Sequence, residues 1–400
     1  MKILHTSDWH LGASVGQEKR YDEFEKILSA LTGIVKSEKV EAIIVAGDVF
    51  DSGLPSNRAM EMYYCFLAEL SKNSDVKSII ITAGNHDSAS FLEAPKALLK
   101  AFKIHIVGKV DPENPDDLII PLKDDNGNIA AVVCALPHLR DRDIRKAVSG
   151  QDVATQISSR QEAFIKIYQQ TAARAAELYP SHPLIATGHF YLAGSVFSDS
   201  NQIVGTLNDI NPASLPENIQ YYALGHLHKP QNVGKSHRFR YSGSLLQMSF
   251  VDSNTAKSVT IIDSSALDAE PKIIELPCFI PMLKISGTAD ELKQQLDELK
   301  TKNAPCRIHA ENTGDFEHEL LQKLNKHCEN SPLTILSCSN LKPNPALVKI
   351  RPKAQDLSKL TPADVFATLI EDFDTERKTE LTAAFNEAVT ALDEEDKNEE

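Results

Sequence analysis

Short apolar runs and longer amphipathic stretches alternate through the first 110 residues, and this alternation constrains the fold more than any other feature of the chain. The runs are rich in β-branched residues, as buried strands are, while the stretches repeat apolar residues at helical spacing. The runs are residues 2–6, 42–46 and 78–83, and the stretches are residues 20–38, 57–71 and 91–102. This βαβαβα order predicts strands packed under helices, with ligands gathering at the carboxyl ends of the strands.

The next part of the chain predicts a second sheet and a smaller domain. A strand near 129–136 and a long helix near 155–178 precede a region of short strands that ends near residue 276. We therefore expect an α/β fold over residues 1–276, with two stacked mixed sheets flanked by helices. Strands and helices alternate again over residues 277–341, which predicts a small α/β capping domain.

The C-terminal region predicts a linker followed by two helices. Residues 342–359 contain three prolines and are expected to be a linker, because proline cannot continue a helix or donate to a strand ladder. Residues 360–400 carry apolar residues at helical spacing and end in an acidic tail. Such an apolar stripe can pack against its own chain or dock on a partner, and the pattern leaves both open.

Composition and charge exclude several classes of protein. Hydrophobic residues make up 42% and charged residues 24% of the chain, as in an ordinary globular protein. The first residues turn polar too early for a secretory signal, and the longest apolar run is too short to cross a bilayer. The six cysteines form no Cys-x-x-Cys pair, which favours a reducing compartment. We expect a protein without a membrane segment, in the cytoplasm and associated with the nucleoid.

The net charge of −14 is unevenly distributed along the chain. From Asp364 onward there are 13 acidic and 3 basic residues, which gives −10 for this region and leaves −4 for the first 363 residues. The overall charge therefore does not exclude a basic, DNA-binding surface on the body of the protein.

Five short motifs follow predicted strands and carry candidate metal ligands. They are Asp8-Trp-His10, Gly47-Asp48, Gly84-Asn85-His86, Gly188-His189 and Gly225-His226-Leu-His228. In the first and last motifs the i, i+2 spacing places both side chains on one face of extended backbone, so each pair can converge on one point. A single Asp or His at a strand end is usually structural, but five ordered motifs together favour a metal centre.

The donor set indicates which metals the centre suits. It comprises oxygen donors from Asp8, Asp48 and Asn85, and nitrogen donors from His10, His189, His226 and His228. Seven such ligands are too many for one tetrahedral zinc but suit two divalent ions that share a carboxylate, and we expect manganese. Two ions about 3.5–4 Å apart can hold a hydroxide and stabilise both oxygens of a phosphoryl transfer. Phosphoester hydrolysis is the expected reaction.

Over residues 1–275 these motifs resemble those of the calcineurin-like metallophosphoesterases, which implies the fold of that family. Residues 2–12, 45–51 and 83–88 are most similar to the nuclease subunits of bacterial complexes that process DNA ends in replication, repair and recombination.

The resemblance also implies roles for individual residues. One ion would be held by Asp8, His10, Asp48 and His228, and the other by Asp48, Asn85, His189 and His226, with Asp48 bridging the two. His86 would be the catalytic residue that protonates the leaving oxygen, a role that suits imidazoles because they titrate near neutral pH. Asp51 and Asp87 could orient neighbouring histidines or cap turns, and both remain open.

The resemblance further implies a manganese-dependent nuclease, acting as an exonuclease on duplex DNA ends and as an endonuclease on single strands and hairpins. It implies a homodimer within a heterotetramer. Because the chain lacks a Gly-x-x-x-x-Gly-Lys-[Ser/Thr] loop, the ATPase would be a separate subunit, docked on the C-terminal helices. Two alternatives remain: a stand-alone phosphodiesterase or phosphatase acting on small or phosphoprotein substrates, and a non-catalytic scaffold of the same fold.

The residues that contact DNA are harder to predict. The loop 136–146 contains Arg140 and three further basic residues, but two aspartates offset them, so a solvated surface loop is favoured. Lys19, Arg20 and Arg58 follow the first two motifs and are candidates for contacts with backbone phosphates. Trp9 is expected to pack in the core, on the opposite face from its neighbouring ligands.

Overall fold

The structure is a computed structural model of the 400-residue chain. It describes residues 1–73, 75–111, 113–140, 153–196, 210–253 and 255–342, and short C-terminal pieces at 366, 370, 377–379 and 381–386. None of the helices in these ranges has the length and apolar character that a membrane span requires.

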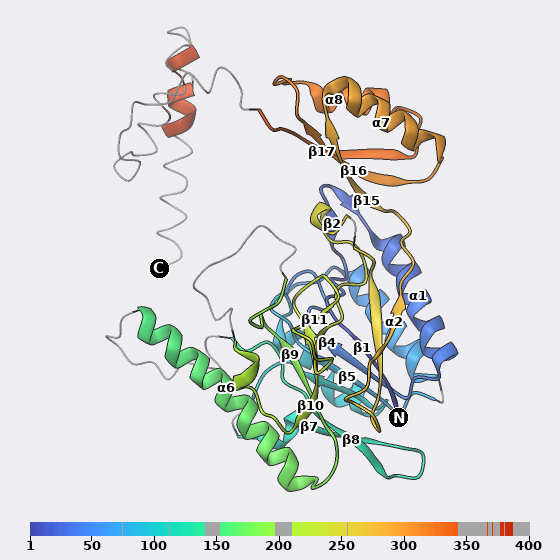
Figure 1. Cartoon of the computed structure of the whole chain (residues 1–400), viewed down its shortest axis with the longest axis vertical. Helices are drawn as coiled ribbons and strands as arrows, with labels where there is room; N and C mark the ends of the chain where they lie inside the picture. Colours follow the sequence, from blue (N-terminus) through green and yellow to red (C-terminus); the bar gives the residue numbers. More distant parts are fainter. Residues whose placement is uncertain are drawn as a thin grey trace. The chain divides into compact units, whose positions relative to one another are not determined.

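The first sheet contains the predicted alternation of strands and helices (Figure 1). Its strand order is β14-β13-β1-β4-β5-β6. The strands are β1 (Lys2–Thr6), β4 (Ala42–Ala46), β5 (Ser78–Thr82), β6 (Ile104–Val107), β13 (Ser258–Asp263) and β14 (Lys272–Glu275). Because β1, β4, β5 and β6 are parallel, their carboxyl ends lie at one edge of the sheet, whereas β13 and β14 pair antiparallel.

Helices α1 (Tyr21–Glu38) and α2 (Asn57–Ser71) pack on this sheet, close to their predicted bounds. The Ser56 side chain caps α2 by accepting a hydrogen bond from the amide of Ala59. The prediction of one helix over 91–102 is wrong, because two short helices, α3 (Ala89–Glu93) and α4 (Lys96–Lys100), take its place. Pro95 separates them, since it has no N–H to continue the first helix.

The second sheet is also mixed, with the order β11-β12-β10-β9-β8-β7. Its strands are β7 (Ile119–Lys123), β8 (Ile129–Cys134), β9 (Leu184–His189), β10 (Ile219–Gly225), β11 (Gln231–Asn232) and β12 (Phe239–Tyr241). Strands β8, β9, β10 and β12 run parallel. Helix α6 (Val153–Leu178) packs on β8 and β9. The predicted fold of two mixed sheets flanked by helices is confirmed.

Short elements complete this part of the chain. They are the hairpin β2 (Ser14–Val15) and β3 (Glu18–Lys19), and the 3-10 helices η1 (Pro115–Leu118), η2 (Pro212–Ser214) and η3 (Phe250–Asp252).

Alternate residues of the strands in the first sheet enter two different cores. On β1 and β4, Ile3 and Ile44 belong to the core that includes residues of β8, β9 and β10, so this core lies between the two sheets. Leu4 and Ile43, one residue further or earlier, belong to the core formed with α1 and α2. Burial on both faces explains why these strands read as continuous apolar runs.

His5 lies fully buried between the two sheets and crosses from one to the other. Its Nδ1 lies 2.9 Å from the Tyr221 hydroxyl and its Nε2 lies 3.2 Å from the Leu224 carbonyl oxygen. A carbonyl only accepts, so Nε2 donates and Nδ1 accepts from the tyrosine. Burial, and then the charge of Arg240, lower the pKa of His5 from 6.5 to about 3. The folded protein therefore keeps His5 neutral.

This burial predicts a loss of stability in mild acid. The unfolded chain takes up a proton at His5 as the pH falls below 6.5, whereas the folded chain does so only near pH 3. His5 alone should therefore reduce the free energy of unfolding by about 2 kcal/mol between pH 7 and pH 5. Urea unfolding of the wild type and of His5→Gln, both in EDTA, measures the difference. An identical decrease in both proteins would contradict this assignment.

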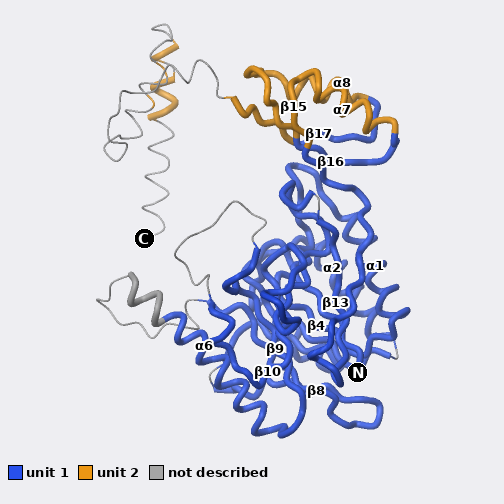
Figure 2. The backbone as a smooth tube through the Cα atoms, in the orientation of Figure 1, with its two compact units in different colours: residues 1–284, 302–309, 330–336 blue, residues 285–301, 310–329, 337–400 orange. Residues whose placement is uncertain are grey.

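The described chain divides into two compact units, coloured separately in Figure 2. The smaller unit contains Ile285–Thr301, Ala310–Glu329 and the chain from Ser337. Across its region run β15 (Met282–Gly287), β16 (Cys306–Asn312) and β17 (Leu333–Asn340), in that order in one sheet, with helices α7 (Ala289–Thr301) and α8 (Leu320–His327). The predicted bounds of the capping domain at 277 and 341 remain predictions.

The predicted linker over 342–359 lies outside the described residues, apart from Lys342, and so does most of the C-terminal region over 360–400. Of the latter, residues 377–379 and 381–386 are helical, and the ring of Phe366 stacks on that of Phe385 with centroids 4.2 Å apart.

Candidate metal centre

The five motifs meet because each follows the carboxyl end of a parallel strand. Asp8 and His10 follow β1, Asp48 follows β4, Asn85 and His86 follow β5, His189 ends β9, and His226 and His228 follow β10. All seven predicted ligands thus come to one place, from both sheets. That they bind metal remains a prediction.

The backbone brings the ligands together by left-handed turns rather than by extended geometry. The φ angles of Asp8, His10, Asp48 and His226 are 50°, 46°, 51° and 94°. The expectation that Asp8 and His10 share a face of extended backbone is therefore wrong, although the pair does converge. Left-handed residues other than glycine cost of order 1–3 kcal/mol each and cluster at functional sites.

Two glycines are required by close packing at these turns. A Cβ at Gly84 would lie 2.1 Å from Asp48 Oδ1, and a Cβ at Gly225 would lie 1.9 Å from the Ala46 carbonyl oxygen. Neither position can accommodate a side chain, which is why glycine precedes the ligands there.

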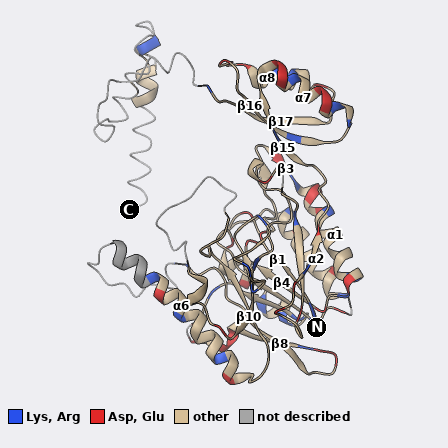
Figure 3. Cartoon of the chain, viewed as in Figure 1, with Lys and Arg blue, Asp and Glu red and all other residues tan. Residues whose placement is uncertain are grey.

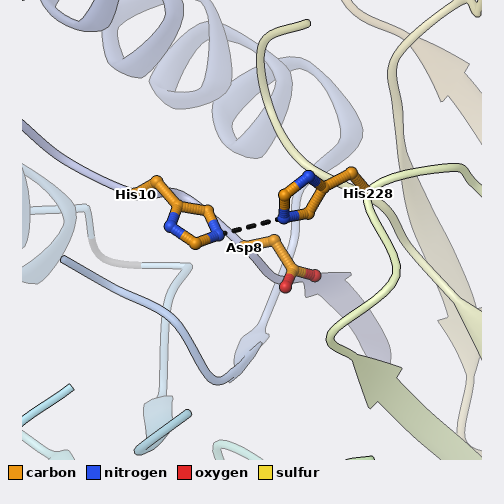
Figure 4. Close-up of side chains that lie close together, drawn as sticks. All are labelled: Asp8, His10 and His228. Atoms are coloured by element: carbon orange, nitrogen blue, oxygen red, sulfur yellow. Dashed lines mark hydrogen bonds between the residues drawn. The ribbon is translucent and has the colours of Figure 1, made fainter. Parts of the chain in front are cut away.

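Asp8, His10 and His228 form the first group of ligands (Figure 4). The imidazoles of His10 and His228 point toward each other, with their Nε2 atoms 3.1 Å apart, and Asp8 lies beside them. The other ring nitrogen of His10, Nδ1, lies 3.4 Å from the Asp51 carboxylate. Asp51 therefore orients His10, one of the two roles considered for it.

Asp48, His189 and His226 form the second group, and Asn85 joins it. The side-chain oxygen of Asn85 lies 3.0 Å from His189 Nε2 and 2.9 Å from His226 Nδ1. Asp48 Oδ2 lies 3.2 Å from His189 Nε2 and 3.5 Å from His10 Nε2. Asp48 thus stands between the two groups, as a bridging carboxylate must.

The protonation of His189 shows why this group fits a cation. Its Nδ1 donates to the Ala46 carbonyl oxygen at 2.9 Å, so in the neutral ring Nε2 carries a lone pair. That lone pair faces the oxygens of Asp48 and Asn85. Acceptors that face one another repel unless a proton or a metal ion lies between them, and oxygen with imidazole nitrogen suits a divalent cation.

The electrostatics of the two groups agree with this reading. Burial lowers the pKa of His189, but the adjacent Asp48 carboxylate outweighs it and raises the pKa to about 9. Burial also opposes ionisation of Asp48, yet the charges of His189 and His10 hold its pKa well below the usual range. Burial and then the charge of His189 lower the pKa of His226. At neutral pH a cation must therefore displace the proton of His189.

One side of the centre is open. Asp8, His10, Asp48 and His189 are buried, whereas Asn85 and His86 are exposed. The His86 amide donates to Asp48 Oδ1 at 2.8 Å, and its ring Nδ1 donates to the Asp51 carbonyl oxygen at 2.9 Å. The main chain of Asp51 thus fixes the His86 ring at the exposed edge of the centre.

Asp87 caps the turns that carry the ligands. Its buried carboxylate accepts hydrogen bonds from the amides of Gly84 at 2.8 Å, Val49 at 3.1 Å and Phe50 at 2.9 Å. Among the two roles considered for Asp87, the structure favours the capping of turns.

Asp87→Ala would leave three buried amides without an acceptor. Each unpartnered buried donor costs about 1–3 kcal/mol, so we expect the free energy of unfolding to fall by about 3 kcal/mol or more. Asp87→Asn keeps one oxygen and should cost less. Urea unfolding of both variants checks this, and an Asp87→Ala protein as stable as the wild type would refute it.

Several residues that support the centre were missed by sequence reasoning. The Ser7 hydroxyl donates to Asp8 Oδ2 and contacts the Ser242 hydroxyl at 2.8 Å. His138 donates through Nδ1 to the His189 carbonyl oxygen at 2.9 Å, and the Tyr191 ring lies 4.0 Å from that of His226, centroid to centroid. The segment Tyr241-Ser-Gly-Ser244, directly after β12, was the available signal, because small polar residues again follow a strand.

The remaining sequence predictions have mixed outcomes. Trp9 is buried and packs edge-on against Phe66, which confirms its place in the core. Arg20 is wrong as a DNA contact, because it is buried and bonds to Glu23. Arg58 pairs with Asp22 and Glu25, and Lys19 is exposed. In the predicted surface loop, residues 141–146 lie outside the described residues, while Arg140 donates to the Asp87 carbonyl oxygen.

Comparison with known proteins places this fold and site in a class. Residues 1–230 match the family described as calcineurin-like phosphoesterase, and residues 278–372 match the family described as type 5 capsule protein repressor C-terminal domain. The fold and the ligand arrangement thus define a calcineurin-like phosphoesterase.

The similar curated proteins are all SbcD, the D component of the nuclease SbcCD. The chain is 34% identical to SbcD of Rhodobacter capsulatus, over 92% of this chain and 94% of that protein. It is 30% identical to SbcD of Escherichia coli K12, over 98% of each chain, and 32% identical to SbcD of Bacillus subtilis, over 82% and 83%. The chain belongs to the SbcD family, which confirms the resemblance found in its motifs.

Proposed function

We propose that this chain is the metal-dependent nuclease subunit of an SbcCD-type complex and that it hydrolyses phosphodiester bonds of DNA. The observation that carries this proposal is the position of Asp48, whose carboxylate lies 3.2 Å from His189 and 3.5 Å from His10. It stands between two groups of ligands that come from different sheets. The relatives named as nuclease subunits supply the substrate class.

The ligand sets follow from these groups. One divalent ion is held by Asp8, His10, Asp48 and His228, and the other by Asp48, Asn85, His189 and His226. Manganese suits this mixture of oxygen and imidazole donors without sulfur. Two ions held there would activate a water molecule and stabilise the charge that develops on the phosphoryl oxygens.

His86 is placed to act on the substrate rather than to hold a metal. It lies at the exposed edge of the centre, and its Nδ1 is already committed to the Asp51 carbonyl oxygen. Its Nε2 is therefore the nitrogen left to protonate the leaving oxygen of the cleaved phosphodiester. The hydrogen bond to Asp51 keeps the ring in one orientation for this transfer.

The substrates and the assembly follow from the family. The chain acts as an exonuclease on duplex ends and as an endonuclease on hairpins and single strands, in the cytoplasm with the nucleoid. It forms a homodimer within a heterotetramer that contains an SbcC-like ATPase. Among the described helices, α1, α6 and α7 carry acidic and basic residues side by side (Figure 3), so the DNA path is not marked by charge on them.

The ATPase subunit is expected to dock on the C-terminal helices. Deleting the residues after 350 should abolish co-purification with the SbcC-like subunit, because the apolar stripe of residues 360–392 would be lost. Metal content should remain unchanged, since the deletion removes no predicted ligand. Co-purification of the deleted chain at wild-type yield would refute the docking site.

A manganese-supplemented cleavage assay tests the proposed function. The intact chain with its ATPase subunit is compared on linear duplex DNA, hairpin DNA, a cyclic nucleotide and a phosphoprotein. We expect turnover of the two DNA substrates to exceed that of the others. Faster turnover of the cyclic nucleotide or phosphoprotein would favour a stand-alone phosphodiesterase or phosphatase, and fewer than two bound ions per chain with no turnover would favour a scaffold.

A further inference from the structure

The main-chain carbonyl of His228 is held by donors that lie far from it in the sequence. The Lys257 ammonium donates to this oxygen at 2.8 Å, and the Ser244 amide donates at 3.2 Å. The Ser244 hydroxyl lies slightly further away, at 3.4 Å. These donors fix the backbone of one predicted metal ligand.

Lys257 is an unusual donor because it is almost completely buried. Its side chain is 5% exposed, and it pairs at 3.2 Å with Asp252, whose side chain is 1% exposed. Asp252 is itself fixed, because its Oδ2 also accepts from the Met248 amide at 3.0 Å. Two charges withdrawn from water are costly unless they are paired and hydrogen-bonded, so the pair has one defined geometry.

The neighbouring backbone allows little movement of this arrangement. Gly243 has a φ of +80°, and a Cβ there would lie 2.8 Å from the His228 carbonyl oxygen and 2.7 Å from the Pro230 ring. The chain on both sides of His228 is therefore packed against the segment that supplies Ser244. Only Lys257 in this arrangement brings a charged donor to the oxygen.

We propose that Lys257, held by Asp252, is a positioning residue that sets the affinity of one of the two metal ions. This inference rests on the proposed function and concerns the ion shared by Asp8, His10 and His228. A fixed carbonyl restricts the backbone of His228, so its imidazole faces that of His10 before any ion arrives. Because Asp252 neutralises the ammonium, Lys257 supplies a strong donor without adding net charge beside the cations.

The other ion does not depend on this pair. His189 is oriented instead by the Ala46 carbonyl oxygen, and His226 contacts Asn85 and the Tyr191 ring. Loss of the Lys257 donor should therefore weaken one ion and spare the other, which a general loss of folding would not do.

Manganese titration of metal-free, full-length protein tests the proposal, by calorimetry and by electron paramagnetic resonance. The key variant is Lys257→Met/Asp252→Asn, which removes the donor and the charge together and so leaves no unpaired buried charge. Lys257→Gln/Asp252→Asn has the same net charge but restores an N–H donor. Arg238→Met is a matched control, because its guanidinium holds carbonyl oxygens of Ile219 and Pro216 instead.

We expect Lys257→Met/Asp252→Asn to bind one ion as the wild type does and the second about 10–100-fold more weakly. The Gln variant should recover most of this loss, and Arg238→Met should bind both ions normally. Thermal unfolding verifies that each variant is folded. If the Met/Asn variant does not fold, Lys257→Met/Asp252→Leu takes its place, since apolar replacements of buried ion pairs are commonly tolerated.

Three outcomes would overturn the proposal: unchanged affinity for both ions in the Met variant, equal weakening of both ions, or no recovery in the Gln variant. A wild-type chain that binds fewer than two ions is a different result. It would remove the proposed function itself rather than the role of Lys257.

Discussion

Asp48→Ala is expected to lower the rate of DNA cleavage by about 10⁴-fold or more and to remove at least one bound ion. Asp48 is the carboxylate that approaches both groups of ligands, through His10 and His189. A two-metal centre contributes several kcal/mol of transition-state stabilisation, and each 1.36 kcal/mol corresponds to about tenfold in rate. Cleavage of linear and hairpin DNA in manganese buffer, together with the metal content of the protein, measures both effects.

Asp116→Ala is the matched control for this variant. Asp116 is an exposed aspartate paired with Arg174, and it is not among the predicted ligands. Its removal should change neither cleavage nor metal content. An Asp48→Ala protein that retained two ions, or that cleaved DNA at the wild-type rate, would show that Asp48 does not bridge the centre.

His86→Ala is expected to lower the rate of cleavage by about 10²–10⁴-fold while both ions remain bound. The imidazole lies at the exposed edge of the centre and is oriented by the Asp51 carbonyl oxygen, as a proton donor to a substrate requires. Metal content is essential to this test, because His86 also lies within 4.8 Å of the ligand atoms of His10 and Asp48.

His182→Ala serves as the control for His86→Ala, since His182 is a histidine whose Nδ1 also bonds to a main-chain carbonyl, that of Pro180. It should cleave DNA like the wild type. If His86→Ala lost an ion together with its activity, His86 would be a ligand and its assignment as a general acid would be wrong.

The layered fold was predictable because its signal is local. Strands buried on both faces read as apolar runs, and α1 and α2 begin and end close to where their apolar spacing does. The predicted helix over 91–102 failed at Pro95, where a helix-like apolar spacing hid a break in the hydrogen-bond ladder.

The ligands were predictable for a similar reason, although the stated geometry was not. Residue types and their positions after strands identified Asp8 and His10, but both adopt left-handed φ angles instead of extended ones. Spacing along a chain cannot reveal a turn of this kind. Only the requirement that donors meet at the strand ends survived from the sequence to the structure.

The residues that hold the ligands could not be predicted, because they join parts of the chain that are far apart. Ser7 meets Ser242, and Lys257 meets the carbonyl of His228, through contacts set by the packing of β1, β12 and β13. Lysine and serine are common surface residues, so neither attracts notice in a sequence. Their burial is a property of the tertiary structure alone.

Anomalous diffraction at the manganese edge, from crystals of the full chain grown with manganese, tests the central claim most directly. We predict two peaks about 3.5–4 Å apart on either side of the Asp48 carboxylate, one beside His10 and His228 and the other beside His189 and His226. A single peak, or two peaks that do not share Asp48, would contradict the two-metal centre.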